Sequence, residues 1–232
     1  MQKPSSKEGI GLMTKMIIVR HAETEANVLQ VWQGALDAPL TARGMLQVEH
    51  TARRIAELTQ EHPLDHFYVS PLPRAQSTAA AIAAAIRLEP VIEPDLREFD
   101  LGDWEGRSFL ELREVENLWN RWAADPAFAP PNGESPLSFG RRVQEAFARL
   151  AADHLDQTLL IVSHGGVISN ILASWLGAGP GDWRNWEAHN CAISVIESSP
   201  ASWQGVLVND IAHLPPAARI EENRSVYQLD DR

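Results

Sequence analysis

The alternation of short apolar runs with longer segments of helical periodicity constrains the fold of this chain most strongly. The runs are too short to be buried helices, they are rich in β-branched residues, and charged residues, glycine or proline bound them. Strands are therefore predicted at residues 16–19, 67–69, 91–92, 158–162, 192–196 and 205–208. Strands that alternate with helices form mostly parallel sheets covered on both faces. The sequence therefore predicts an α/β fold, a three-layer α/β/α sandwich around a mostly parallel sheet.

The helical segments carry apolar residues along one face. Thr41 can cap the first long helix, whose apolar positions recur at three- and four-residue spacing: Met45, Val48, Ala52, Ile55 and Leu58. Further helices are predicted over residues 74–86, 107–122, 139–150 and 167–176. Residues 106–136 interrupt the alternation with a helix and a loop rich in proline and glycine. We expect this stretch to form a small helical cap beside the sheet.

Composition and charge limit the classes of partner. The formal net charge of −11 argues against nucleic acid, because binding to a phosphate backbone needs a basic face. No apolar run is long enough to span a membrane, and a single cysteine, Cys191, is typical of a reducing cytoplasm. We expect one domain over residues 16–214, a loose extension over 1–15 and a peripheral tail over 215–232.

Charged and polar side chains follow three of the predicted strands. Arg20 and His21 follow the first strand, the segment from Ser70 to Arg74 follows the second, and His164 with Gly165 follows the strand near residue 160. The carboxyl ends of strands are where ligands bind in open α/β sheets. Arginine forks suit phosphate oxygens, a neutral imidazole can attack phosphorus, and a helix opened by glycine presents N–H groups to an anion. The set predicts a site for phosphoryl transfer that needs neither a metal nor another cofactor.

Phosphoryl transfer to water also needs a proton donor for the leaving oxygen. An acid-rich turn supplies four candidates, which are Glu98, Asp100, Asp103 and Glu105. A carboxyl group shielded by Trp104 could take this role, and spacing alone does not choose among the four. For the tryptophans, packing in the core and the cap is the preferred interpretation, and a place beside the substrate is an alternative for Trp104 alone.

Several motifs in fixed order resemble those of the histidine phosphatase superfamily, in its phosphoglycerate-mutase-like branch. The motifs are Arg20-His21-Ala22-Glu23-Thr24, with alanine where the family has glycine, Trp32-Gln33-Gly34, Ser70-Pro71-Leu72 with Arg74, Leu96-Arg97-Glu98, Gly102-Asp103-Trp104-Glu105-Gly106 and Ser163-His164-Gly165-Gly166. The resemblance runs from Met16 to Leu214, which is nearly the whole chain.

The resemblance implies a role for each matched residue. It implies that His21 carries the phosphoryl group and that Glu98 acts as general acid and then as general base. It implies that the oxygens of the phosphoryl group are held by Arg20, Arg74, His164 and Asn27, and that Gln33 and Gly34 line the substrate side. The expected partner is a small phosphorylated metabolite. The oligomeric state is left open, with a homodimer among the alternatives.

Three functions are compatible with these residues. Hydrolysis of small phosphate monoesters is preferred, because the stretch between Glu98 and His164 is shorter than the insertion that the resemblance implies for mutases. A phosphoglycerate mutase is the alternative, and a non-catalytic phospholigand-binding protein is the third. A zinc site built on His21 and His164 is disfavoured, because no close-spaced ligand motif is present and the flanking arginines would repel a cation.

Overall fold

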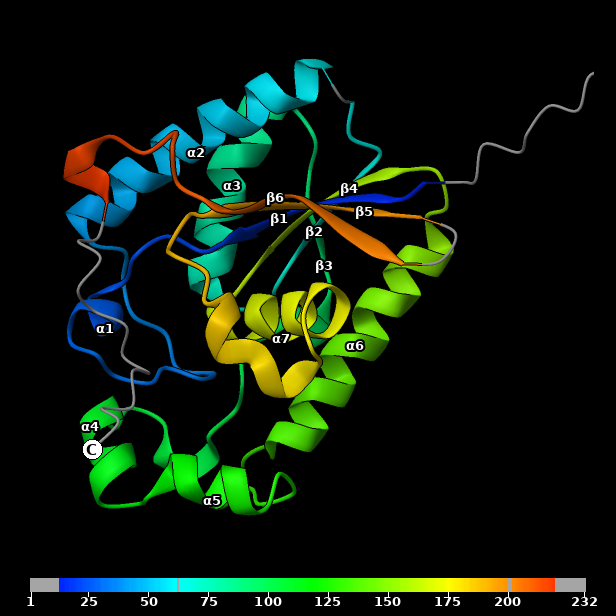
Figure 1. Cartoon of the computed structure of the whole chain (residues 1–232). Coiled ribbons are helices and arrows are strands. Elements are labelled where there is room, and N and C mark those ends of the chain that lie inside the picture. The colour runs from blue at the N-terminus through cyan, green and yellow to red at the C-terminus, as the bar shows by residue number, and fades with distance from the viewer. Residues whose placement is uncertain (1–12, 62, 200–201, 220–232) are drawn as a thin grey trace, which may run out of the picture.

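The computed structural model describes residues 13–61, 63–199 and 202–219. One sheet, with strand order β3-β2-β4-β1-β5-β6, forms the centre of the molecule (Figure 1). Its strands are β1 (Lys15–Arg20), β2 (His66–Val69), β3 (Val91–Ile92), β4 (Thr158–Ser163), β5 (Ile193–Ser198) and β6 (Trp203–Asp210). The first four strands are parallel to one another, and β5 and β6 join antiparallel at one edge. The mostly parallel sheet predicted from the sequence is confirmed.

Helices cover both faces of this sheet, as the pattern of buried residues requires. In β1, Met16 and Ile18 face one way and belong to a core cluster shared with α6 (Pro136–Asp153) and α7 (Gly165–Leu176). Ile17 and Val19 face the other way and pack with α2 (Ala42–Glu61) and α3 (Pro73–Ile86). A strand buried on both faces reads as a continuous apolar run, which explains the uninterrupted pattern of β1. The three-layer arrangement follows, with α2 and α3 opposite α6 and α7 in Figure 1.

Helix α2 begins where its sequence pattern indicates. Thr41 accepts a hydrogen bond from the N–H of Gly44 and so caps the first turn. Val48, Ala52 and Ile55 are buried as expected. The prediction for Met45 is wrong, because its side chain is 59% exposed and the buried face of the first turns carries Gln47 instead.

The region over residues 106–136 contains two short helices rather than the one helix expected over 107–122. They are α4 (Phe109–Glu114) and α5 (Leu118–Ala124), and the chain reverses between them at Asn117, which has a φ of 52°. Val115, which lies at helical spacing from Leu112 and Trp119 in the sequence, is 68% exposed, whereas Leu118 and Trp119 are buried. Both helices lie beyond α6 and α7 on the same side of the sheet (Figure 1).

The remaining segments connect these elements. They are α1 (Glu25–Val28) and the single-turn or 3₁₀ segments at Pro94–Leu96, Gly102–Trp104, Pro180–Trp186 and Pro216–Ala218. Of the extension expected over residues 1–15, residues 1–12 lie outside the described part of the chain. The expected boundary is too late, because Thr14 is already buried and forms hydrogen bonds with His154 and Ser198. The expected peripheral tail is wrong at its start, because Ala218 is fully buried and its carbonyl accepts a bond from Gln47. Residues 220–232 lie outside the described part.

Candidate active site

The candidate site lies where three neighbouring parallel strands end. Strands β2, β4 and β1 are adjacent in the sheet, and Arg20 pairs in register with Ser163. His21 therefore follows β1 beside His164, which follows β4, and their ring centroids lie 5.1 Å apart. Ser70, which follows β2, lies on the other side of His164. The strand ends thus bring together side chains that are far apart in the sequence.

The hydrogen bond of His21 fixes which ring nitrogen is reactive. Nδ1 lies 2.8 Å from the carbonyl oxygen of Ala22, and a carbonyl oxygen can only accept. Nδ1 therefore carries the hydrogen, and Nε2 keeps its lone pair. Burial lowers the pKa of His21 well below its ordinary value of 6.5, and the cations Arg74 and Arg20 lower it further. The imidazole is neutral near pH 7 and suited to act as a nucleophile.

His164 is completely buried behind His21. Its Nε2 lies 2.6 Å from Oγ of Ser70, and its Nδ1 is buried without a hydrogen-bond partner among the described residues. Burial, followed by the charge of Arg74, lowers the pKa of His164 well below 6.5. His164 does not line the cavity described below, so its direct contact with a phosphoryl group stays a prediction.

Two arginines complete the anion-binding end of the site. Arg20 donates from Nη1 to the carbonyl of Ala188, and Arg74 donates to the carbonyls of Leu36 and Gly34. In both arginines Nε is buried and has no partner within the described residues. Burial is the main cause of a lowered pKa of Arg74. A buried, incompletely paired guanidinium is costly unless an anion joins it, so this end of the cavity is suited to phosphate oxygens.

The first turn of α7 positions Glu98. The N–H of Gly166 donates to Glu98 Oε2 over 3.0 Å, and the N–H of Phe99 donates to Oε1 over 2.9 Å. A side chain at Gly166 would collide with this carboxyl group, and one at Gly165 would lie 3.2 Å from the guanidinium carbon of Arg20. The two glycines therefore allow an acid and a cation to approach the same helix N-terminus.

The structure separates Glu98 from the other candidate acids. Asp100 accepts from the N–H of Gly102, and Asp103 accepts from Asn132. Glu105 accepts from the N–H groups of Ala35 and Leu36, and burial raises its pKa. Glu98 lines the cavity beside His21, whereas the other three do not. Geometry therefore selects Glu98, which spacing alone could not do.

Asn27, predicted to contact the phosphoryl oxygens, lines this cavity together with Gln33 and Gly34, which are predicted on the substrate side. Oδ1 of Asn27 accepts hydrogen bonds from Thr24 and from Asn190. Nε2 of Gln33 donates to Oγ1 of Thr24. Gly34 has a φ of 51° and a carbonyl that receives Arg74. These three residues therefore shape the wall next to the arginines.

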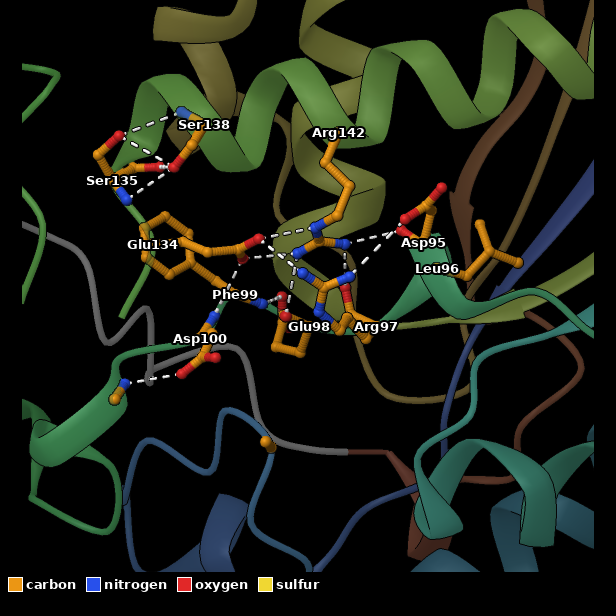
Figure 2. A network of polar contacts seen from close by, with 12 residues as sticks. Asp95, Leu96, Arg97, Glu98, Phe99, Asp100, Glu134, Ser135, Ser138 and Arg142 are labelled. Atoms are coloured by element: carbon orange, nitrogen blue, oxygen red, sulfur yellow. Dashed lines mark hydrogen bonds and ion pairs between the residues drawn. The ribbon is translucent and has the colours of Figure 1, made fainter. Parts of the chain in front are cut away.

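A mostly buried ion pair holds the segment that carries Glu98. Arg142 donates to both carboxylate oxygens of Glu134, and also to the carbonyls of Asp95, Arg97 and Glu98 (Figure 2). Its side chain is 10% exposed. Glu134 also accepts from Arg97 and from the N–H of Asp100. The pair therefore fixes the backbone on both sides of Glu98. From the sequence alone, a solvated helix face is the preferred interpretation for Arg142, with a contact to a substrate carboxylate as the alternative, and neither describes this ion pair.

Sequence reasoning missed other residues as well. Asn190 donates to the carbonyl of His21, and Thr78 accepts from the N–H of Ala22, so both fix the backbone around the nucleophile. Trp104 packs against Phe128 and does not line the cavity, so the preferred interpretation of core and cap packing holds for it and the alternative place beside the substrate does not. Trp119 and Trp122 line the cavity instead. Their three-residue spacing on a helix was visible in the sequence, but it is equally typical of core packing.

Among residues 13–61, 63–199 and 202–219, no group of three or more His, Cys, Asp or Glu side chains is placed to hold a metal ion. None of the helices in these ranges is both long enough and apolar enough to cross a membrane.

Comparison with known proteins gives one consistent family. The model of the histidine phosphatase superfamily, branch 1, matches residues 16–211. A probable phosphoglycerate mutase GpmB from Proteus mirabilis is 33% identical over 219 residues, which are 91% of this chain and 100% of that protein. A putative phosphoserine phosphatase 2 from Hydrogenobacter thermophilus is 31% identical over 203 residues, covering 87% and 98% of the two chains.

A solved structure is similar over the same length. It is a phosphoserine phosphatase variant from Entamoeba histolytica in complex with phosphoserine. The TM-score is 0.76 and the sequence identity 28%, with 87% of this chain and 100% of that chain covered.

Proposed function

This chain belongs to the histidine phosphatase superfamily, and we propose that it hydrolyses small phosphate monoesters through a phosphohistidine formed on His21. One observation carries the proposal. The Nδ1–H of His21 is engaged by the carbonyl of Ala22, so Nε2 is the unprotonated nitrogen in a cavity that also holds two arginines with unpartnered Nε groups. The phosphatase names among its relatives and structural neighbours support hydrolysis.

The first half of the reaction transfers the phosphoryl group to the enzyme. Nε2 of His21 forms a bond to phosphorus while the bond from phosphorus to the ester oxygen breaks. The carboxylic acid form of Glu98 gives its proton to that oxygen, which leaves as the alcohol. Arg20 and Arg74 neutralise charge on the phosphoryl oxygens throughout, since their guanidinium groups lie at this end of the cavity.

The second half returns the enzyme to its starting state. Glu98, now a carboxylate, takes a proton from water as the water oxygen bonds to phosphorus and the bond to Nε2 of His21 breaks. Inorganic phosphate leaves, and His21 is again neutral with its hydrogen on Nδ1. Each step uses groups that this chain supplies.

A trapping experiment tests the nucleophile. A radiolabelled monoester is mixed with the enzyme and quenched in base, because phosphohistidine is labile in acid. We expect labelled protein with the natural sequence and with His50→Ala, a histidine that does not line this cavity, and none with His21→Ala. Full turnover by His21→Ala would overturn the mechanism.

A phosphoglycerate mutase is the second candidate, because the relative from Proteus mirabilis carries that name. Both reactions share the phosphohistidine and differ in the acceptor. With 3-phosphoglycerate as the substrate, hydrolysis releases inorganic phosphate and isomerisation gives 2-phosphoglycerate. We expect release of phosphate. A faster appearance of 2-phosphoglycerate would assign the mutase instead.

A small phosphorylated metabolite is the partner that this proposal requires. A cytoplasmic location and a homodimeric state stay predictions from the sequence.

A further inference from the structure

The cavity that contains His21 is much larger than a phosphate group needs. Its volume is about 1230 Å³, whereas pockets for drug-sized ligands span roughly 300–1,000 Å³. Arg20, His21 and Arg74 lie close together in its lining. A three-carbon phosphate ester would leave most of the remaining volume to water. The shape of the rest of the cavity therefore indicates what kind of alcohol the ester carries.

An aromatic wall begins directly beside the proton donor. Phe99 follows Glu98 in the chain, and its ring centroid lies 5.0 Å from that of Trp122 and 4.7 Å from that of Phe139. The three rings come from the loop after Glu98, from α5 and from α6, and all three residues line the cavity. In the proposed mechanism Glu98 protonates the leaving oxygen. The alcohol therefore lies on the side where this wall stands.

Polar groups without partners lie along the same part of the cavity. Asn170 is one helical turn beyond Gly166 on α7, so the two residues share a face of that helix. Its side chain is 6% exposed, and its Oδ1 is buried without a hydrogen-bond partner in the described part of the chain. The same holds for Nε1 of Trp122. Both atoms have almost no accessible surface, and leaving them unpaired is costly, so rotation of either side chain toward a ligand in the cavity would gain a hydrogen bond.

The charges beyond the phosphate end do not suit a second anionic group. Three further arginines line the cavity. Arg43 is paired with the buried Glu23 over 2.8 Å, and Arg184 lies over the ring of Trp183. Arg141 is exposed, and Glu145 stands one turn further along α6. Carboxylates at Glu145 and Glu187 also line this region. An acidic alcohol such as a phosphorylated hydroxy acid would meet these carboxylates.

We propose that the preferred substrate is a nucleoside-like phosphate monoester, whose uncharged alcohol carries a flat ring against Phe99, Trp122 and Phe139 and gives an N–H or O–H to Oδ1 of Asn170. This inference rests on the proposed phosphatase function and adds its substrate class. Asn170 is the residue that determines specificity, because it recognises the ring rather than the reacting phosphate.

Two matched pairs of esters test the wall and the hydrogen bond separately. Adenosine 5′-monophosphate and ribose 5-phosphate share a primary phosphate on a ribose and differ in the ring. 2-Phenylethyl phosphate and ethyl phosphate differ only in a ring that cannot form hydrogen bonds. We expect the ring-bearing ester to have a kcat/KM about tenfold or more higher in each pair. We also expect 3-phosphoglycerate to be poorer than adenosine 5′-monophosphate.

Substitution of Asn170 separates recognition from folding. Asn170→Ala should lower kcat/KM for adenosine 5′-monophosphate about tenfold or more and leave that for 2-phenylethyl phosphate within about twofold. Ser174→Ala, one turn further along α7 and outside the cavity lining, is the control and should change neither value. An equal loss on both esters in Asn170→Ala would assign a structural role to this residue.

The outcomes distinguish this inference from the function on which it rests. Turnover of all five esters without preference for a ring, or with preference for 3-phosphoglycerate, would overturn the substrate class and leave the phosphohistidine mechanism standing. Absence of turnover and of a phosphoenzyme with every ester would overturn both.

Discussion

The protonation state of His21 governs its reactivity, because only the neutral ring has a free lone pair on Nε2. Burial and two arginines lower the pKa of His21 well below 6.5. The ring should therefore stay neutral as pH falls through 6.5 and take up a proton only in more acidic solution. We expect NMR of ¹⁵N-labelled histidine, with the His21 signal assigned by its loss in His21→Gln, to show no titration between pH 7.5 and pH 6. A midpoint near 6.5 would contradict the buried environment.

Arg142 offers a test of how Glu98 is positioned. Lysine keeps the charge but cannot form the bonds that Arg142 makes to Glu134 and to three carbonyls. We expect Arg142→Lys to lower the free energy of unfolding by about 1–3 kcal/mol in urea titrations. We also expect kcat to fall more for an alkyl phosphate than for p-nitrophenyl phosphate, whose leaving group needs no proton. The exposed Arg53→Lys is the control, and equal losses on both substrates would argue against positioning of the acid.

Single residues were predictable from the sequence where they follow a strand. Arg20, His21 and His164 were placed together correctly, because parallel strands end at the same edge of a sheet. The choice of Glu98 among four nearby acids was not accessible from spacing, since it depends on the distant N–H of Gly166. The proposed role of Asn170 was not accessible from spacing either, because it depends on a buried Oδ1 that has no hydrogen-bond partner among the described residues.

Helix α7 and Glu98 interact through a glycine that has no room for a side chain. In Gly166→Ala the added methyl group would collide with the carboxyl group of Glu98. Alanine favours helix, so we expect little loss of stability and a displaced Glu98 instead. We predict that kcat for an alkyl phosphate falls about 10²-fold, within the range for loss of a general acid. Phosphoenzyme formation from p-nitrophenyl phosphate should persist.

The matched control for this variant is Gly181→Ala. Gly181 also lines the cavity, but a Cβ there would meet no atom within 4 Å, and its φ is not in the left-handed region. Its kinetics should equal those of the natural sequence. An equal decrease of kcat in both alanine variants would show that the effect does not come from Glu98.

Elements were predictable where periodicity and burial agree, and not where tertiary packing competes. The spacing of Leu112, Val115 and Trp119 fits one continuous helix. The chain instead reverses at Asn117, one of the residue types that tolerate a positive φ, and this turn buries Leu118 and Trp119 while exposing Val115. Local propensity therefore predicts correctly that this region is helical, but it does not predict the break between α4 and α5.

At the scale of the whole molecule, the sheet and the cap supply different groups to the candidate site. Strand ends and the start of α7 supply the phosphate-binding groups, and α5 and α6 supply the rings opposite them. The first set follows from the alternation of strands and helices, which is visible in the sequence. The position of the aromatic rings depends on how α5 packs relative to the sheet, and no local sequence pattern predicts that packing.

Stability of the whole fold should depend on pH through histidines that are kept neutral. The pKa of His213 is lowered to about 4, mainly by burial, and those of His21 and His164 are also lowered. Between pH 6.5 and these lower values the unfolded chain binds protons that the folded chain does not. Stability is therefore full above pH 6.5 and falls as pH decreases below it.

The slope of this dependence is at most about 1.4 kcal/mol per pH unit for each such histidine, and less for the half-buried His213. We expect urea titrations at pH 7.5, 6 and 5 to show the decline, and His213→Gln to show a shallower one. The partner of His213 is the hydroxyl of Thr51, which glutamine can also reach, so the variant should keep its stability at pH 7.5. Identical slopes for the two proteins would mean that His213 takes up its proton in the folded state as readily as in the unfolded chain.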